Sequence, residues 1–186
     1  MLNLNRNVMS PLRFTLSYRG PLRADSAKDK QNIRLRLHDQ LKLLWGGFPF
    51  DKFHDHHFTD VESKKLVGKV IYLPLVRKSA RLMAELDIFL LRNEAPGRII
   101  VGGGDIDNRL KTLFDALRCP HSAKEAGSQS HTDSEIYTLL EDDSLITAVS
   151  VTTDRLLEQC ESEEALLIVR VSVIPINFPV GGIGFA

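Results

Sequence analysis

Apolar and polar residues alternate along Leu12–Tyr18 (LRFTLSY), and this alternation predicts a β-strand that the following Gly20-Pro21 pair ends. Further apolar runs rich in β-branched and aromatic residues predict more strands. These runs are Val67–Val76, Met83–Leu91, Leu145–Thr152 and Leu166–Ile174, with a shorter extended segment expected at Arg98–Val101.

Two segments carry a helical period instead. Between residues 28 and 45, leucine and isoleucine recur every three to four positions, Ser26 is a suitable N-cap, and Gly46-Gly47 ends the pattern. The second helix is predicted at Asp107–Arg118, because Leu110, Leu113, Phe114 and Leu117 form one apolar stripe. Strands and helices in this order predict an α+β fold with a mixed or antiparallel sheet and two main helices.

The length of 186 residues favours one domain spanning residues 1–186. Two segments lack a clear period and are expected to be loops. They are Phe48–Ser63, which mixes proline, aromatic residues and histidine, and a small, polar, flexible loop at about residues 119–134.

The chain has 24 Lys and Arg residues and 24 Asp and Glu residues, so its formal net charge is zero. This balance argues against a strong nonspecific binder of nucleic acid or membranes. We expect no membrane association and a cytoplasmic location, because no run of about 18 apolar residues occurs and the first residues lack the apolar core of a secretory signal. The two cysteines, Cys119 and Cys160, have no metal-ligand spacing and are expected to be free thiols.

Candidate chemistry is concentrated at GGGDIDNRLK, where a strand is expected to give way to a helix. Asp105 and Asp107 lie on the same side of an extended chain, and Lys111 follows Asp107 by one helical turn. A third acidic group, Glu141–Asp143, directly precedes a predicted strand. If the chain folds so that these carboxylates converge, their repulsion favours a bound cation, and oxygen ligands favour Mg²⁺ or Mn²⁺ over zinc.

Other interpretations of the same residues stand beside this one. Asp107 alone suits a helix start, and the Glu141–Asp143 run alone suits an exposed turn. A calcium loop of the EF-hand type fails because Leu110 occupies the position that requires glycine, and a phosphate-binding P-loop lacks its Gly-Lys-Ser/Thr sequence. A metal-dependent nucleotidyltransferase or glycosyltransferase with a D-x-D motif stays open.

The segments DIDNRLKTLFDAL (Asp105–Leu117) and EDDSLI (Glu141–Ile146) resemble the signature of RusA-type Holliday junction resolvases. That signature is D-x-D-N-x-x-K, then F-D-A-L, then D-D before a strand. The resemblance assigns catalytic positions to Asp105, Asp107, Lys111 and Asp143. It gives further motif positions to Asn108, Asp115 and Asp142.

The resemblance implies a homodimeric, Mg²⁺-dependent endonuclease that cuts branched DNA, with Mn²⁺ as a plausible substitute. It implies metal binding by Asp105, Asp107 and Asp143, so that a water is activated for attack on a phosphodiester. Lys111 would neutralise phosphoryl oxygens or position the water. The competing class of function is a non-catalytic nucleic-acid-binding or assembly protein that uses the acids structurally.

Basic residues in the first half of the chain are the candidates for phosphate contacts with DNA. They are Arg34, Arg36, Lys64, Lys65, Arg77 and Lys78. The cluster His54–His57 (HDHH) is a weaker metal candidate, since neighbouring imidazoles in an irregular segment are more often solvated. Trp45 is expected to lie in the core.

Overall fold

The computed structural model describes residues 12–47, 63–95, 97, 106–126, 134–159, 161 and 163–176. In chain order its elements are β1 (Leu12–Pro21), α1 (Ala27–Trp45), β2 (Lys65–Val67), β3 (Val70–Val76), β4 (Leu82–Arg92), α4 (Ile106–Leu117), α5 (Ala123–Ala126), β5 (Glu135–Leu140), the 3₁₀ turn η3 (Asp143–Leu145), β6 (Ile146–Arg155) and β7 (Glu164–Pro175). The expected α+β class with mixed sheets and two main helices is confirmed.

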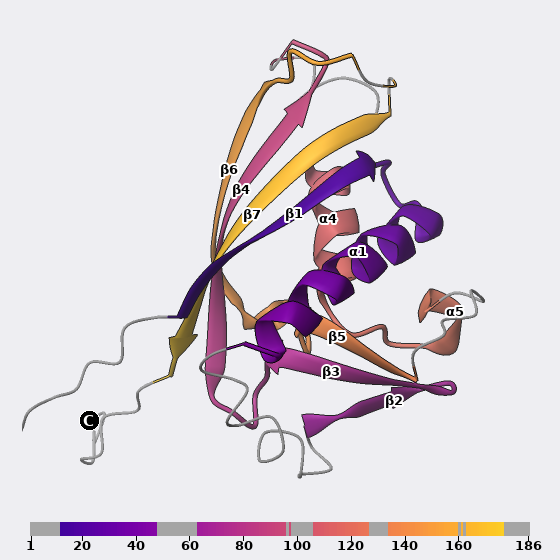
Figure 1. Ribbon diagram of the computed structural model, residues 1–186, viewed down its shortest axis with the longest axis vertical. Coiled ribbons are helices and arrows are strands. Elements are labelled where there is room, and N and C mark those ends of the chain that lie inside the picture. The colour runs from indigo at the N-terminus through magenta and orange to yellow at the C-terminus, as the bar shows by residue number, and fades with distance from the viewer. Residues whose placement is uncertain are drawn as a thin grey trace, which may run out of the picture.

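The strands form two sheets. The larger one has the order β1-β7-β4-β6, in which β4 and β6 are parallel and the other neighbours antiparallel. The smaller one has the order β2-β3-β5, with β3 and β5 parallel. Figure 1 shows α1 and α4 together on one side of the larger sheet, with the smaller sheet beneath α1.

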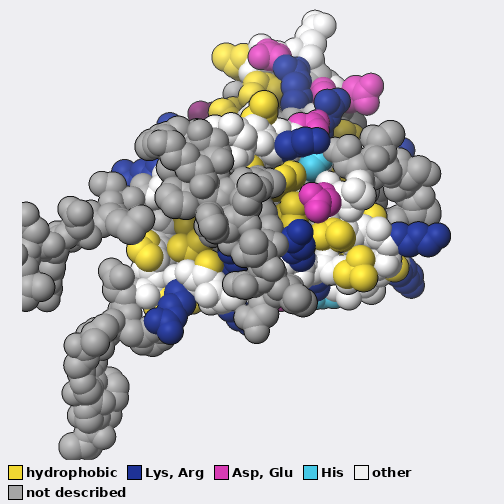
Figure 2. Space-filling model, turned by 60° about the horizontal axis from the view of Figure 1, so that its bottom comes forward, with side chains coloured by type: hydrophobic (Ala, Val, Ile, Leu, Met, Phe, Trp, Pro, Cys, Tyr) yellow, Lys and Arg dark blue, Asp and Glu magenta, His cyan; other side chains and the backbone are white. Residues whose placement is uncertain are grey.

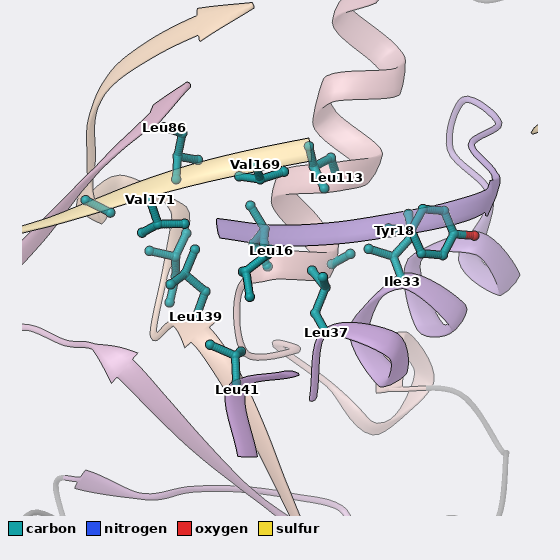
Figure 3. Packing of buried hydrophobic residues seen from close by; sticks show 14 of the residues in the cluster. Leu16, Tyr18, Ile33, Leu37, Leu41, Leu86, Leu113, Leu139, Val169 and Val171 are labelled. Carbon is teal, nitrogen blue, oxygen red and sulfur yellow. The ribbon is translucent and has the colours of Figure 1, made fainter. Parts of the chain in front are cut away.

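One hydrophobic core joins both sheets to both main helices. Alternate residues of β7 point inward, including Val169 and Val171, and α1 contributes Ile33, Leu37 and Leu41. Figure 3 shows these side chains meeting Leu113 of α4 and Leu139 of β5. Because the helical and strand periods each direct one stripe of apolar residues to the same interior, burial of that stripe fixes how the elements pack.

The start of α1 matches its sequence signal. The side chain of Ser26 accepts a hydrogen bond of 3.2 Å from the backbone N–H of Asp29, as expected of an N-cap. The buried carboxylate of Asp29 is in turn held by the guanidinium of Arg23 at 2.6 Å. Trp45, the last residue of α1, is buried, as predicted.

Three local predictions are corrected. The run Val67–Val76 is a hairpin and not one strand, since the chain turns at Gly68, whose φ of +65° favours glycine. The strand β5 lies where the sequence analysis expected no strand. Part of the segment expected to be a loop at 119–134 forms the short helix α5.

Several expected features lie outside the described residues. They are the loop at 48–62, the short extended segment at 98–101, Cys160 and residues 127–133 of the polar loop. Among the helices that are described, none is long and apolar enough to cross a membrane.

Candidate metal site

The first turns of α4 are fixed by contacts on one side of the helix. Arg109 is buried and donates a 2.9 Å hydrogen bond to the carbonyl of Leu22. Thr112 is also buried, and its hydroxyl binds both the carbonyl of Arg23 (3.1 Å) and the backbone N–H of Asp25 (3.0 Å). These bonds and the apolar stripe of the helix attach this side of α4 to the β1–α1 connection, so the opposite side faces solvent.

The solvent-facing side of α4 carries the residues that sequence analysis singled out. Asp107, Asn108 and Lys111 are all exposed. Within the part of the chain that the structure describes, none of these three side chains takes part in a hydrogen bond or ion pair. Two oxygen-bearing side chains and one amine are therefore presented together over about one turn and a half of helix.

The second half of the candidate site is the acidic turn that precedes β6. Asp142 caps η3, and its carboxylate accepts a 3.1 Å hydrogen bond from the backbone N–H of Ser144. Hydrogen bonding with Ser144 lowers the pKa of Asp142, and the positive charges of Lys78 and His121 make smaller contributions in the same direction. Asp143 is exposed. Asp142 therefore has a local structural role, and Asp143 is the carboxylate that this turn leaves available.

The acidic turn is anchored to the smaller sheet on both sides. The backbone N–H of Glu141 donates to the carbonyl of Val76 at 2.9 Å, and the Glu141 carboxylate accepts from the backbone N–H of Lys78 at 2.9 Å. On the other side, Arg118 forms a β-bridge with Leu140 of β5, and the backbone N–H of Cys119 donates to the carbonyl of Leu140 at 2.9 Å. The end of α4 is therefore bonded to the strand that leads into the acidic turn.

These anchors bring η3 into contact with α4, although their sequence positions are about 30 residues apart. Leu145, the last residue of η3, is buried in the main core together with Leu113 and Leu117 of α4. The bridge at Arg118 lies at the C-terminal end of α4, whereas Asp107 lies in its first turn. The acidic turn and α4 are thus neighbours, with Asp107 at the far end of the helix from that bridge.

The full predicted ligand set is only partly described. Asp105 lies outside the described residues, as does the cluster His54–His57. Among the residues that are described, no group of three or more His, Cys, Asp or Glu side chains is close enough to hold a metal ion. The exposed carboxylates of Asp107 and Asp143 have the donor chemistry that suits a hard divalent cation.

A different set of charges on α4 is buried. The carboxylate of Asp115 accepts from Lys30 of α1 at 2.8 Å and from Arg118 at 2.6 Å, and Arg118 also contacts Glu125 of α5 at 3.0 Å. Burial opposes ionisation of Asp115, but the bonds from Lys30 and Arg118 outweigh it, so its pKa is lowered. This aspartate, a further motif position in the resemblance, is part of the packing between helices.

For two of the six basic residues, burial contradicts the prediction that they contact DNA. Arg34 is only 1% exposed and donates to the backbone carbonyl of Asp115 at 2.7 Å and to Gln31 at 2.8 Å. Arg77 is also buried, and its guanidinium donates to the carbonyl of Pro74. Neither guanidinium is presented at the surface to a phosphate.

The other four basic residues retain at least partial exposure. Arg36, Lys64 and Lys78 are exposed, and Lys65 is partly exposed on β2. On the face shown in Figure 2, the described Lys and Arg side chains are scattered and do not form one continuous basic patch. This distribution agrees with the zero net charge.

Lys78 and His121, which come from two other segments of the chain, lie near the acidic turn. Lys78 lies beside Asp142, because its backbone is bound to Glu141 and its charge helps to lower the pKa of Asp142. His121 is exposed, and its charge contributes to the same shift. No sequence signal joins these two residues, since their proximity depends on the pairing of β3 with β5.

Cys119 is buried and has no disulfide partner, in agreement with the expected free thiol. Burial raises its pKa to about 11, so the thiol stays protonated near neutral pH and is a poor metal ligand or nucleophile.

Comparison with known proteins identifies no relative: no family model, curated protein or solved structure matches this chain.

Proposed function

We propose that the protein is a Mg²⁺-dependent endonuclease that hydrolyses phosphodiester bonds of branched DNA. The observation that carries the proposal is the contact between α4 and η3. This contact makes neighbours of two elements that bear the two halves of the RusA-like motif, although the halves are distant in sequence.

The exposure of the motif residues supports the proposal in a second way. Asp107, Lys111 and Asp143 are exposed, and no described side chain neutralises them. Asp115, whose role is structural, differs from these residues, because it is buried and doubly paired. Available carboxylates are what binding of a divalent cation requires.

In the proposed site, Asp105, Asp107 and Asp143 would hold Mg²⁺, which supplies Lewis-acid stabilisation and lowers the pKa of a bound water. Lys111 would approach a non-bridging oxygen of the scissile phosphate and stabilise the negative charge that develops there. Asp142 would position Asp143 through its cap of η3, and Asn108 would donate from its amide to the phosphate or to a carboxylate.

The branched DNA substrate rests on the motif resemblance, and Lys78 gives the site a cation for a neighbouring phosphate. Its backbone is fixed one strand away from the acidic turn, while its side chain is exposed. Phosphate contacts of this kind weaken as salt concentration rises.

The direct test compares cleavage of a four-way junction and of a linear duplex of the same length, with Mg²⁺ and with EDTA. We expect Mg²⁺-dependent cleavage of the junction, and a loss of about 100-fold or more in Asp107→Asn. Asp154→Asn is the matched control, since it removes an exposed carboxylate at the far end of β6.

Three results would contradict the nuclease. The first is equal cleavage by the wild type and Asp107→Asn. The second is binding of the junction without cleavage, which would favour the non-catalytic class. The third is incorporation of nucleotides in place of strand cleavage, which would favour a nucleotidyltransferase.

A further inference from the structure

The outer face of the larger sheet, on the side away from α1 and α4, carries a hollow of about 510 Å³. Among the described residues, those that line it come from all four strands of the sheet and from no helix. Figure 1 shows both main helices on the other side of this sheet. Side chains alternate between the two faces of a strand. Because Phe14, Val171 and Leu86 face the core, the residues next to each of them in sequence face the hollow.

The charged side chains in the hollow are separated by strand. On the β1–β7 half, all four side chains that face the hollow can donate a hydrogen bond. They are Arg13 and Thr15 of β1 and, opposite them in register, Ser172 and Arg170 of β7. On the β4–β6 half, the charged side chains are both carboxylates, those of Glu85 and Asp87. One half of the hollow is therefore suited to an anionic group and the other half to a cationic group.

These charges neutralise one another only in part. Among the described residues, one ion pair lies in the hollow, between Arg170 and Asp87 at 3.6 Å, with side chains 64% and 40% exposed. So exposed a pair contributes little to stability. Arg13 and Glu85 are exposed and take part in no ion pair within the part of the chain that the structure describes. Both of these side chains are therefore available to a ligand.

Ser172 lies between these two available charges. It pairs in register with Arg13 of β1 on one side and with Glu85 of β4 on the other, and its short side chain leaves the space between them open. Neighbouring strands lie about 4.8 Å apart, so the midpoint between β1 and β7 is about 7 Å from β4. Two residues of extended peptide span about 7 Å as well. The spacing therefore fits a ligand of that length with opposite charges at its two ends.

We propose that the hollow binds a small zwitterionic ligand of the size of a dipeptide, with its carboxylate on Arg13 and its ammonium group on Glu85. The hydroxyl of Ser172 would donate to the carboxylate, and Asp87 adds a second negative charge near the ammonium group. Hydrogen bonds between charged groups at both ends are stronger than neutral ones and fix the direction of the ligand across the strands. The proposal does not rest on the nuclease activity, because the hollow lies on the opposite face of the sheet from α4.

The first experiment is a titration of the ¹⁵N-labelled protein with the dipeptide alanyl-alanine, followed by NMR. Two blocked peptides are the comparison: the N-acetylated form lacks the ammonium group, and the C-terminal amide lacks the carboxylate. We expect alanyl-alanine to shift the backbone amide signals around Ser172, and each blocked peptide to bind about tenfold more weakly. No shift around Ser172, equal binding of all three peptides, or tighter binding of either blocked peptide would overturn the proposal.

The second experiment matches each charge to one end of the ligand. Glu85→Gln should weaken binding of alanyl-alanine by about tenfold and leave binding of the N-acetylated form unchanged, because that form has no ammonium group. Arg13→Gln should act in the same way on alanyl-alanine and the amide. Arg155→Gln is the matched control, since Arg155 is exposed and does not line the hollow, and it should bind like the wild type.

Circular dichroism checks that the three variants are folded. Unchanged binding of alanyl-alanine in Glu85→Gln or in Arg13→Gln would contradict the site, as would an equal loss in Arg155→Gln. So would a tenfold loss for the N-acetylated form in Glu85→Gln, because Glu85 would then act on some other part of the peptide.

Discussion

Two aspartates of the helix α4, Asp107 and Asp115, are eight residues apart and have opposite surroundings. Asp115 is buried and binds the cations of Lys30 and Arg118 at 2.8 and 2.6 Å. Asp107 is exposed, and no described residue pairs with it. The same residue type on one helix thus serves packing at one end and is available to a ligand at the other.

The difference follows from what each end of α4 packs against. The C-terminal half of the helix faces α1, with α5 beside it, and buried carboxylates there must be neutralised by cations and hydrogen bonds. The side of the first turns that carries Asp107 faces solvent, so an unpaired carboxylate costs little there. Folded stability therefore depends on Asp115, whereas Asp107 is left available to the proposed cation.

The largest expected effect is on stability. Asp115→Ala should lower the free energy of unfolding by about 3 kcal/mol, because it leaves Lys30 and Arg118 without their shared carboxylate. Asp107→Ala should change it by no more than about 0.5 kcal/mol in the absence of divalent metal. Urea denaturation in EDTA measures both, and equal losses in the two variants would remove the distinction between the two ends of α4.

A smaller effect is the pH dependence of the contribution from Asp115. Its pKa in the folded protein is lowered, so its stabilisation is fully present above the unfolded value of about 3.9 and is lost as pH falls through the folded pKa. The stability difference between the wild type and Asp115→Asn should therefore shrink below about pH 4. A difference that grows on acidification would contradict the lowered pKa.

The smallest effect separates charge pairing from helix formation. Ser26→Ala removes the N-cap of α1, the helix that supplies Lys30, and should cost about 1 kcal/mol. Because the loss does not involve Asp115, it should be nearly additive with that of Asp115→Ala. Strong non-additivity in urea denaturation would show that the cap and the ion pairs act as one unit.

Much of the fold could be predicted because it depends on periodicity within one segment. The strands β1, β4 and β7 and both main helices have a clear period and recognisable ends. The strand β5 has no such signal, since most of its side chains are buried and it is stabilised by pairing with β3 and with the residues after α4. The turn at Gly68 was missed because it interrupts an otherwise continuous apolar run.

The sequence could indicate which residues belong to the candidate site, but not which residues they contact. Local spacing indicated Asp107 and Lys111 on one exposed helix side, which is confirmed. The sequence pattern of α1 could not show that Arg34 is buried, because one of its partners, the carbonyl of Asp115, meets it only when α1 packs on α4. Its other partner is Gln31 of the same helix. Glu125, Lys78 and His121 gained their roles in the same way, through contacts between distant segments.

The central claim is that Asp107 and Asp143, on two neighbouring elements, hold one divalent cation. Its most direct test is a crystal structure of the protein soaked with Mn²⁺, in which anomalous scattering locates the ion. The claim predicts one Mn²⁺ site with carboxylate oxygens of both Asp107 and Asp143 at about 2.2 Å, and loss of that site in Asp143→Asn. Mn²⁺ bound to only one of the two aspartates, or to neither, would contradict it.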